Sequence, residues 1–370
     1  MRRNLVLLIK PASGACNLMC KYCFYHDVAE NREQRSYGIM KEETMEEIVK
    51  KAYDYADGAI SFAFQGGEPT LRGLDFFKTF IAFVSKYNKN NVKTHFAIQT
   101  NGILVDEEWA KFLSENKFLV GLSMDGYREI NDLNRVGTDG KGTFKKVKDA
   151  TRIMDKYKVE YNILCVVTKP IAKHGVKVYN FFKSNGFRYI QFIPCLDDFG
   201  EEKGKRPYSL SPKDYGRFLI SIFDMWYKDL ISNNYISIRM FDNLINMLKG
   251  YPPESCDMMG VCSKGTIIEA DGSLYPCDFY VIDKWRIGSV LDESFEELIA
   301  NPKMDEFVET SKNIDEECKT CRHYMLCRSG CRRHKEHCGD GEDLKNIFCE
   351  SYKLFYDYAE NKLKHIARVV

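Results

Sequence analysis

The chain has 370 residues, which is enough for one large domain or two ordinary ones. Hydrophobic residues make up 44% and charged residues 29%, as in most globular proteins, and a formal net charge of +1 gives no bulk field for nucleic acid or an anionic membrane. No apolar run is long enough to cross a bilayer. The first apolar run, LVLLI, stops at Lys10-Pro11 without a small-residue cleavage site, so we expect a buried strand and a cytoplasmic protein.

Six short apolar runs alternate with longer amphipathic stretches in the first two thirds of the chain. The runs are NLVLLI and residues 59–65, 94–99, 118–124, 160–168 and 189–195. Most are continuously apolar, as in parallel strands that are covered on both faces. Helix-like segments lie between these runs, at residues 41–56, 107–116 and 174–186. This order predicts an α/β fold with a partial (β/α)6 parallel barrel in residues 1–241, although the pattern alone leaves an open sheet as the alternative.

Glycine-rich and polar segments follow four of these strands. They are QGGEP (65–69), QTNG (99–102), SMDG (123–126) and PCLD (194–197). An α/β barrel places its chemistry at the carboxyl ends of its strands. Any one of these segments could be a simple turn, but four similar strand ends predict a functional face.

The character of the sequence changes after a long helix candidate at residues 211–231. GYPPESC (250–256) is typical of a linker or domain junction. GTIIEADGSLYPCDFYV (265–281) predicts a β-hairpin with Asp271-Gly272 as its two-residue turn. We expect residues 242–370 to contain the linker, a cysteine-rich domain and a C-terminal helix.

Fourteen cysteines are many for a chain from a reducing compartment, where clustered cysteines are typically metal ligands or redox groups. Cys16, Cys20 and Cys23 have the spacing C-x3-C-x2-C, and no fourth cysteine lies nearby. Three thiolates on a four-iron cluster leave one iron open, to which a chelating small molecule could bind. The spacing alone also allows an incomplete zinc site or a cluster with a distant fourth ligand.

Eight further cysteines are enough for two fully ligated four-iron clusters. They are Cys256, Cys262, Cys277, Cys318, Cys321, Cys327, Cys331 and Cys349. A zinc ribbon would explain one C-x2-C pair but not all eight. We expect Cys165 and Cys195 to be small buried residues of core strands, and Cys338 to be a bystander in a charged loop.

The triad after the first strand, with Tyr22 before its last cysteine and GGEP after the second strand, resembles the radical S-adenosylmethionine superfamily. The resemblance implies that S-adenosylmethionine completes the open iron, and that the reduced cluster cleaves it to a 5′-deoxyadenosyl radical. From Cys262 onward the pattern resembles the SPASM extension of these enzymes. That resemblance, rather than the spacing, implies two auxiliary clusters with a crossed pairing. One is held by Cys256, Cys262, Cys277 and Cys331, and the other by Cys318, Cys321, Cys327 and Cys349.

Longer blocks resemble the anaerobic sulfatase-maturating enzymes over nearly the whole chain. They include CNLMCKYCFYH, SYGIM, FAFQGGEPTL, KFLSENKFLVGLSMDG and CRSGCRRHKE. The resemblance implies oxidation of a sulfatase cysteine or serine to Cα-formylglycine, in which the radical removes a Cβ hydrogen and an auxiliary cluster accepts an electron. Asp278 matches the base of the family. The implied partners are an unfolded or nascent sulfatase carrying C/S-x-P/A-x-R and an electron donor such as flavodoxin or ferredoxin.

The resemblance also carries over residues that contact the cosubstrate, S-adenosylmethionine. They are Tyr22, Gly67, Glu68, Ser123, Arg135 and Leu196. Gly67 is expected to let the backbone approach the methionine amino group, which Glu68 stabilises. Tyr25 and Gln65 are candidates to face the substrate peptide. Arg239 either helps to hold the peptide or is a buried structural arginine.

Two other functions are consistent with parts of this pattern. One is a SPASM enzyme that forms a thioether or carbon–carbon crosslink in a ribosomal peptide. Such enzymes often carry a leader-peptide domain first, which we do not expect here because the first strand begins at about residue 4. The other is a non-catalytic iron–sulfur electron carrier, which would need neither the open-iron triad nor GGEP.

Overall fold

The computed structural model describes residues 2–335 and 344–369, and Cys338 lies outside these ranges. The chain divides into two compact units. The first consists of Met1–Ser123, Arg135–Tyr161 and Lys264–Phe307, and the second of Met124–Asn134, Asn162–Ser263 and Val308–Val370. Among the described residues, no helix is long and apolar enough to cross a membrane.

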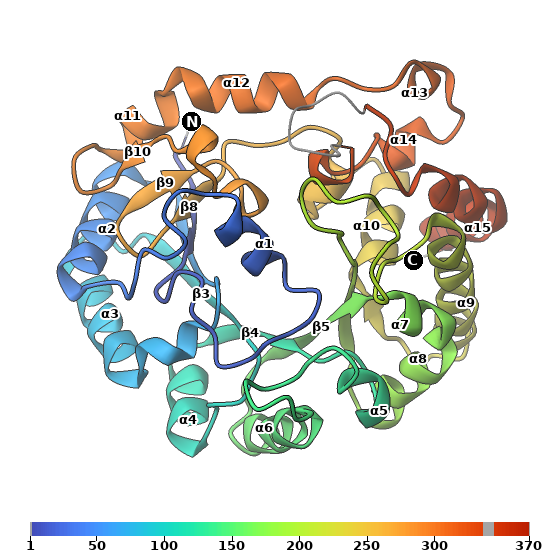
Figure 1. Cartoon of the computed structure of the whole chain (residues 1–370), viewed down its shortest axis with the longest axis horizontal. Coiled ribbons are helices and arrows are strands. Elements are labelled where there is room, and N and C mark those ends of the chain that lie inside the picture. Colours follow the sequence, from blue (N-terminus) through green and yellow to red (C-terminus); the bar gives the residue numbers. More distant parts are fainter. Residues whose placement is uncertain (1, 336–343, 370) are drawn as a thin grey trace. The chain divides into compact units, whose positions relative to one another are not determined.

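Parallel strands form the centre of the first unit (Figure 1). They are β1 (Leu5–Ile9), β2 (Ala59–Phe64), β3 (Lys93–Thr100) and β4 (Phe118–Ser123), paired in this order. Each strand end lies within one residue of its predicted position, because continuous apolar runs between polar segments mark buried strands clearly. The predicted α/β class is confirmed.

The other edge of β1 pairs with a segment from far along the chain. This segment contains β8 (Thr266–Ile268), β9 (Ser273–Tyr275) and β10 (Gly288–Ser289). Strand β8 runs parallel to β1, and β9 and β10 continue the sheet in antiparallel pairs. The first unit therefore has the strand order β10-β9-β8-β1-β2-β3-β4.

The predicted hairpin is present, but its turn differs from the expected one. The N–H of Glu269 donates to the carbonyl of Ser273 at 2.9 Å, and the N–H of Gly272 donates to the carbonyl of Glu269 at 3.0 Å. The loop is therefore residues 270–272, closed by Gly272 with a φ of +89°. A three-residue loop that ends in a glycine bulge is a common alternative to the two-residue turn, so that prediction was wrong.

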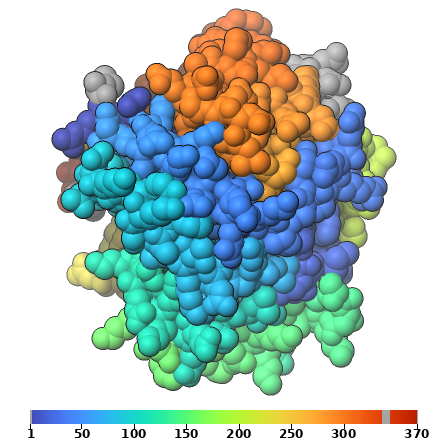
Figure 2. Space-filling model, turned by 90° about the vertical axis from the view of Figure 1, so that its left-hand side faces the viewer, coloured from blue at the N-terminus to red at the C-terminus, as the bar shows by residue number. Residues whose placement is uncertain are grey.

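Amphipathic helices lie beside the strands of the first unit, and α2, α3 and α4 follow one another around them in Figure 1. The helices are α1 (Phe24–Glu30), α2 (Glu42–Tyr55), α3 (Leu74–Tyr87), α4 (Glu107–Glu115), α6 (Phe144–Lys156) and α11 (Phe295–Ala300), with short 3-10 helices η1 (Pro69–Arg72), η3 (Asp278–Tyr280) and η4 (Asp283–Trp285). Figure 2 shows the C-terminal segment of this unit, in orange, lying against its N-terminal segment, in blue. Lys51 of α2 contributes to this contact, because it donates to the carbonyls of Val290 and Glu293 at 2.6 and 3.0 Å.

The second unit contains the parallel strands β6 (Tyr189–Pro194) and β7 (Ser237–Ile238), and all of β5 (Tyr161–Val167) except its first residue. Its helices are α5 (Arg128–Asn131), α7 (Lys169–Lys173), α8 (Gly175–Ser184), α9 (Pro212–Ile231), α10 (Arg239–Leu248), α13 (Glu316–Thr320), α14 (Tyr324–Cys327) and α15 (Cys349–Val369), with η2 (Cys256–Met258) and η5 (Arg332–His334). Helix α12 (Pro302–Ser311) begins in the first unit and ends in the second. Helices α9 and α15 pack together through aromatic rings such as Phe223 and Phe355, 5.6 Å apart. Cys165 and Cys195 are buried, as expected.

Aromatic side chains fill the space between β2 and α3. Phe64 is completely buried, and its ring lies 4.9 Å from both Phe77 and Phe80 in edge-to-face contacts. This packing holds the end of β2, from which the QGGEP segment continues.

Replacing Phe64 by alanine is expected to lower the free energy of unfolding by about 3–5 kcal/mol, because the neighbouring rings cannot fill the cavity. Urea unfolding of the cluster-loaded protein under anaerobic conditions measures this loss. The control is Val6→Ala on β1, whose side chain is 65% exposed and should change stability by less than about 0.5 kcal/mol. Equal losses in the two variants would contradict a core role for Phe64.

Candidate active site

The cysteine triad lies on the loop between β1 and α1. The N–H of Leu18 donates to Cys16 Sγ at 3.4 Å, and the N–H groups of Tyr25 and His26 donate to the Cys23 sulfur. Such donors stabilise a negative sulfur. Burial nevertheless dominates and raises the pKa of the Cys16 thiol to about 11, so the thiolate form needs a further positive partner. An iron–sulfur cluster fits this donor set, because coordination to a metal deprotonates a thiol.

The QGGEP segment meets the triad loop backbone to backbone. The N–H of Gly67 donates to the carbonyl of Ser13 at 2.8 Å, and the N–H of Glu68 donates to the carbonyl of Ala15 at 2.7 Å. A Cβ atom at Gly67 would lie 2.0 Å from the Ala15 oxygen. Glycine at this position is therefore required by the triad loop itself, a reason that the sequence pattern did not reveal.

Glu68 joins two strand ends to the triad loop. Its carboxylate is 1% exposed and accepts hydrogen bonds from Thr70, from the Thr100 hydroxyl at 2.7 Å and from the Asn101 N–H at 2.7 Å. Burial raises the pKa of Glu68, and these hydrogen bonds lower it. The side-chain amide of Asn101 in turn reaches Cys16 Sγ at 3.8 Å. These hydrogen bonds thus connect the QGGEP and QTNG segments to Cys16.

The other predicted cosubstrate residues are divided between the units. The Arg135 guanidinium lies 5.5 Å from the centre of the Tyr22 ring. Burial raises the pKa of Cys23, and the positive charge of Arg135 lowers it. Ser123 is the last residue of β4. Leu196, which follows β6, belongs to the second unit.

Asp278 is the centre of a polar cluster in the first unit. Its Oδ2 accepts hydrogen bonds from the Tyr25 hydroxyl at 2.7 Å and from Gln65 Nε2 at 3.0 Å. Gln65 Nε2 also donates to the Tyr25 oxygen at 2.6 Å. Burial and the neighbouring Asp278 together raise the pKa of Tyr25 well above its usual value, so Tyr25 stays a neutral donor. The structure therefore brings together the predicted base and both predicted peptide-facing residues.

Lys10 is a member of this cluster that the sequence motifs did not reveal. Its Nζ forms an ion pair with Asp278 Oδ1 at 2.8 Å and lies 4.6 Å from the centre of the Tyr25 ring. Only 2% of the lysine side chain is exposed. The available signal was a charged residue directly after a buried strand, at the strand end where a barrel places its chemistry.

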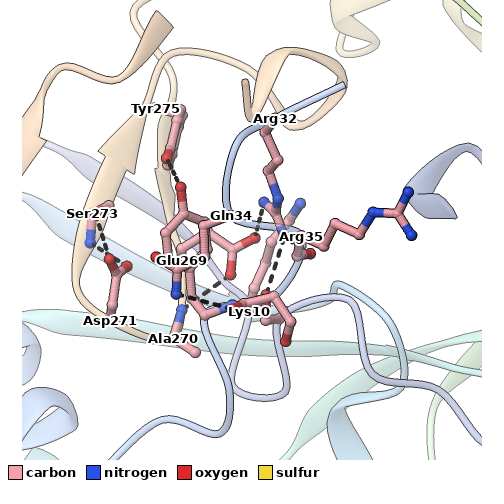
Figure 3. Close-up of polar contacts among 12 residues, drawn as sticks. Lys10, Arg32, Gln34, Arg35, Glu269, Ala270, Asp271, Ser273 and Tyr275 are labelled. Atoms are coloured by element: carbon pink, nitrogen blue, oxygen red, sulfur yellow. Dashed lines mark hydrogen bonds and ion pairs between the residues drawn. The ribbon is translucent and has the colours of Figure 1, made fainter. Parts of the chain in front are cut away.

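A buried ion pair connects the segment after the triad with the β8–β9 hairpin. Figure 3 shows Arg32 reaching Glu269, with Nη1 2.9 Å from Oε1. Both side chains are almost completely buried. Arg32 also donates to Ser13 Oγ at 3.3 Å and to the Arg35 carbonyl at 2.9 Å, and it lies 4.7 Å from the centre of the Tyr37 ring.

Four cysteines of the second unit line one cavity, together with side chains such as Tyr352 and Lys353. They are Cys318, Cys321, Cys327 and Cys349. Burial raises the pKa of Cys327 to about 12, and the charges of the other three cysteines raise it further. Four thiols around one cavity are the donor set of a fully ligated iron–sulfur cluster.

Cys256, Cys262 and Cys331 are close enough to influence one another. Burial is the main cause of the raised pKa of Cys331, and the neighbouring Cys262 and Cys256 raise it further. Cys277 lies in the first unit, directly before Asp278. Arg239 begins α10, where its Nη1 donates to Gln191 Oε1 at 3.0 Å. About a third of the Arg239 side chain is exposed, so it is not a buried structural arginine.

Comparisons with known proteins identify the family of this chain. The family models of the radical SAM superfamily and of the SPASM iron–sulfur cluster-binding domain match residues 11–174 and 256–322. The cysteine-type anaerobic sulfatase-maturating enzyme of Clostridium perfringens (strain 13) is 51% identical over 98% of both chains. The serine-type enzyme of Bacteroides thetaiotaomicron is 29% identical over 96% of this chain and 89% of its own. The solved structure of native anSMEcpe with bound AdoMet and Cp18Cys peptide has a TM-score of 0.95 at 51% identity and covers 99% of both chains.

The chain belongs to the family of anaerobic sulfatase-maturating enzymes. It is a radical S-adenosylmethionine enzyme with a SPASM domain, which confirms the predicted fold class and enzyme class. Membership also implies iron–sulfur clusters, S-adenosylmethionine as cosubstrate and a sulfatase peptide as substrate.

Replacing Gly67 by alanine should displace the triad loop, because the added methyl group would overlap the Ala15 carbonyl. We expect the variant to lose the iron of the triad and to keep the iron held by the C-terminal cysteines. Iron and sulfide analysis with electron paramagnetic resonance measures this change. The control is Gly14→Ala in the same loop, where a Cβ meets nothing within 4 Å. Normal triad iron in the Gly67 variant would refute the steric argument.

Replacing Arg32 by methionine leaves Glu269 buried without its cation, which should cost about 3–5 kcal/mol of stability. Removing both charges in Arg32→Met/Glu269→Met should restore part of this loss. Anaerobic urea unfolding measures both variants. In the control Arg152→Met, an exposed pair with Asp149 at 2.7 Å is removed, and the loss should stay below about 1 kcal/mol. If the Arg32 variant lost no more than this control, the pair would have no special role.

Proposed function

We propose that the protein oxidises a specific cysteine of a sulfatase to Cα-formylglycine, and that Asp278 is the base that removes the thiol proton. The preference for cysteine is supported by the relatives, since the cysteine-type enzyme is 51% identical and the serine-type enzyme 29%. The geometry around Asp278 supports the assignment of the base.

The position of Asp278 is the observation that carries the proposal. In the sequence, Asp278 directly follows Cys277. Its carboxylate accepts a hydrogen bond from Tyr25, which lies two residues after Cys23 of the triad. The neighbourhood of one proposed cluster ligand and of the triad loop supports a role as proton acceptor for a substrate that loses a hydrogen and an electron. Tyr25 and Gln65 both donate hydrogen bonds to Oδ2 and so hold the carboxylate beside the triad loop.

The proposed reaction removes two electrons and two protons from the cysteine side chain. When bound, S-adenosylmethionine and the triad cluster supply the radical that takes the Cβ hydrogen, and an auxiliary cluster supplies the electron acceptor. Asp278 takes the proton from the thiol, and a carbon–sulfur double bond forms. Water then adds to the thioaldehyde and hydrogen sulfide leaves, so that the aldehyde of formylglycine remains.

We also propose three four-iron clusters. The first is held by the triad, and the other two by the crossed sets predicted for the SPASM region. The cavity that Cys349 shares with Cys318, Cys321 and Cys327 supports the second set, and the proximity of Cys331 to Cys256 and Cys262 supports the first. A small electron-transfer protein such as flavodoxin or ferredoxin would reduce the triad cluster. The domain boundary at residue 241 stays a prediction.

We propose that the six residues carried over by resemblance bind S-adenosylmethionine. The support is strongest for Tyr22, Glu68 and Arg135. The stacking of Arg135 on Tyr22 and the connection from Glu68 to Cys16 support their place beside the triad. Tyr25 and Gln65 would face the reacting side chain. Arg239 would bind the peptide elsewhere along its length.

Replacing Asp278 by asparagine should lower formylglycine formation at least about 100-fold, since the amide cannot accept the thiol proton. The assay is anaerobic, with S-adenosylmethionine, a strong reductant and a C-x-P-x-R peptide, and mass spectrometry reads the peptide and 5′-deoxyadenosine. We expect 5′-deoxyadenosine still to form. The exposed Asp292→Asn is the matched control and should behave as the unaltered enzyme.

The same assay with the unaltered enzyme tests whether the protein forms formylglycine and prefers cysteine. A peptide with serine in place of cysteine should react more slowly if the cysteine preference is right. Formation of 5′-deoxyadenosine with a crosslinked rather than an oxidised peptide would replace maturation by crosslinking. Iron-loaded protein that forms no 5′-deoxyadenosine would refute the radical chemistry.

A further inference from the structure

Lys10 is a buried cation whose one ion pair among the described residues is with Asp278. Its Nζ lies 2.8 Å from Asp278 Oδ1, and only 2% of its side chain is exposed, against 15% for Asp278. Burial of an ammonium group is costly unless a partner compensates it. A lysine buried at the end of a core strand therefore depends on its ion pair with the proposed base, Asp278.

The backbone and the aliphatic part of Lys10 also have close contacts. The Lys10 N–H donates to the carbonyl of Ile268 at 2.8 Å, which joins the residue to β8. Its Cβ and Cγ lie so close to Gly66 that a Cβ on that glycine would be 3.0 and 2.9 Å from them. The side chain thus passes under the QGGEP turn, and the Tyr25 ring covers its Nζ at 4.6 Å.

The two oxygens of Asp278 consequently have different partners. Lys10 pairs with Oδ1, whereas Tyr25 and Gln65 both donate to Oδ2. Contacts on one oxygen alone would let the carboxylate turn about its terminal torsion, which is a broad and soft rotation. The ion pair on Oδ1 and the two hydrogen bonds on Oδ2 come from three segments of the chain, and together they restrain the carboxylate more than contacts on one oxygen would.

We propose that Lys10 is a positioning residue that fixes the carboxylate plane of Asp278 for removal of the thiol proton. This inference rests on the proposed function, because it assigns to Asp278 the role of base. It adds a requirement on timing. After the Cβ hydrogen is lost, the thiol proton must also be removed before the substrate radical is quenched.

Loss of Lys10 should therefore uncouple the two steps. The Cβ hydrogen is still removed, but the misplaced carboxylate fails to take the thiol proton. The substrate radical then gains one electron from the dithionite reductant and one proton from solvent, which restores the starting cysteine. In D2O the recovered peptide should carry one deuterium at Cβ, and 5′-deoxyadenosine should exceed formylglycine.

The test compares Lys10→Met with the unaltered enzyme in the anaerobic peptide assay. Methionine keeps an unbranched apolar stem and removes the charge. We expect the ratio of formylglycine to 5′-deoxyadenosine to fall about 10- to 100-fold, as for a misplaced catalytic group. A Cβ-deuterated peptide should still pass its label to 5′-deoxyadenosine. Iron content and peptide affinity, measured by fluorescence anisotropy, should stay unchanged.

Two further variants separate positioning from a general structural role. In the Asp278→Asn background, adding Lys10→Met should not lower the ratio again, because the proposed effect of Lys10 on the ratio requires the Asp278 carboxylate. Lys10→Arg retains a cation and should recover part of the coupling. An equal fall of the ratio in both backgrounds would overturn the proposal, as would a Lys10→Met protein that loses iron or peptide affinity.

Failure of this inference differs from failure of the proposed function. If the unaltered enzyme forms 5′-deoxyadenosine but no formylglycine, the proposed function is wrong and the inference falls with it. If the unaltered enzyme forms formylglycine and Lys10→Met has the same product ratio, only the role of Lys10 is refuted.

Discussion

The parallel pairing of β8 with β1 is the interaction on which the proposed active site depends. Leu7 pairs with Thr266 and Ile9 with Ile268, so the hairpin from late in the chain joins the edge of the first strand in a defined register. A shift by one residue would turn every side chain of β8 to the opposite face. In the observed register Lys10 leaves β1 beside the hairpin, and Asp278 follows the hairpin into the same polar cluster.

Buried charges around this edge are organised in pairs rather than scattered. Arg32 and Glu269 connect the segment after the triad to the hairpin, and Lys10 and Asp278 connect β1 to η3. Glu68 instead relies on hydroxyl and N–H donors from neighbouring strand ends. Because an uncompensated buried charge is strongly destabilising, each of these contacts holds two segments in one arrangement. The loop with the first three cysteines is therefore held from several sides.

The site residues differ in how far the sequence could identify them. The cysteines stand at spacings that carry chemical meaning, whereas the roles expected for QGGEP and Asp278 came from the resemblance to a known family. Lys10 and the Arg32–Glu269 pair stand in no motif. Residues 32 and 269 are 237 positions apart, and their pairing follows from the β1–β8 contact rather than from any local pattern.

The sequence by itself determined strands β1 to β6, the hairpin and several long helices such as α2, α4 and α9, because continuous apolar runs and helical periodicity are local properties. The number and spacing of the cysteines also limited them to metal or redox centres, and the resemblance to a known family supplied the choice of iron–sulfur clusters. Only the tertiary structure decided that the hairpin extends the edge of β1, that Gly67 is needed by the triad loop, and that Lys10 faces Asp278. These features depend on which distant backbone segments hydrogen-bond to one another, and backbone groups are common to nearly all residues, so the pairing leaves no signature in the residues of one segment.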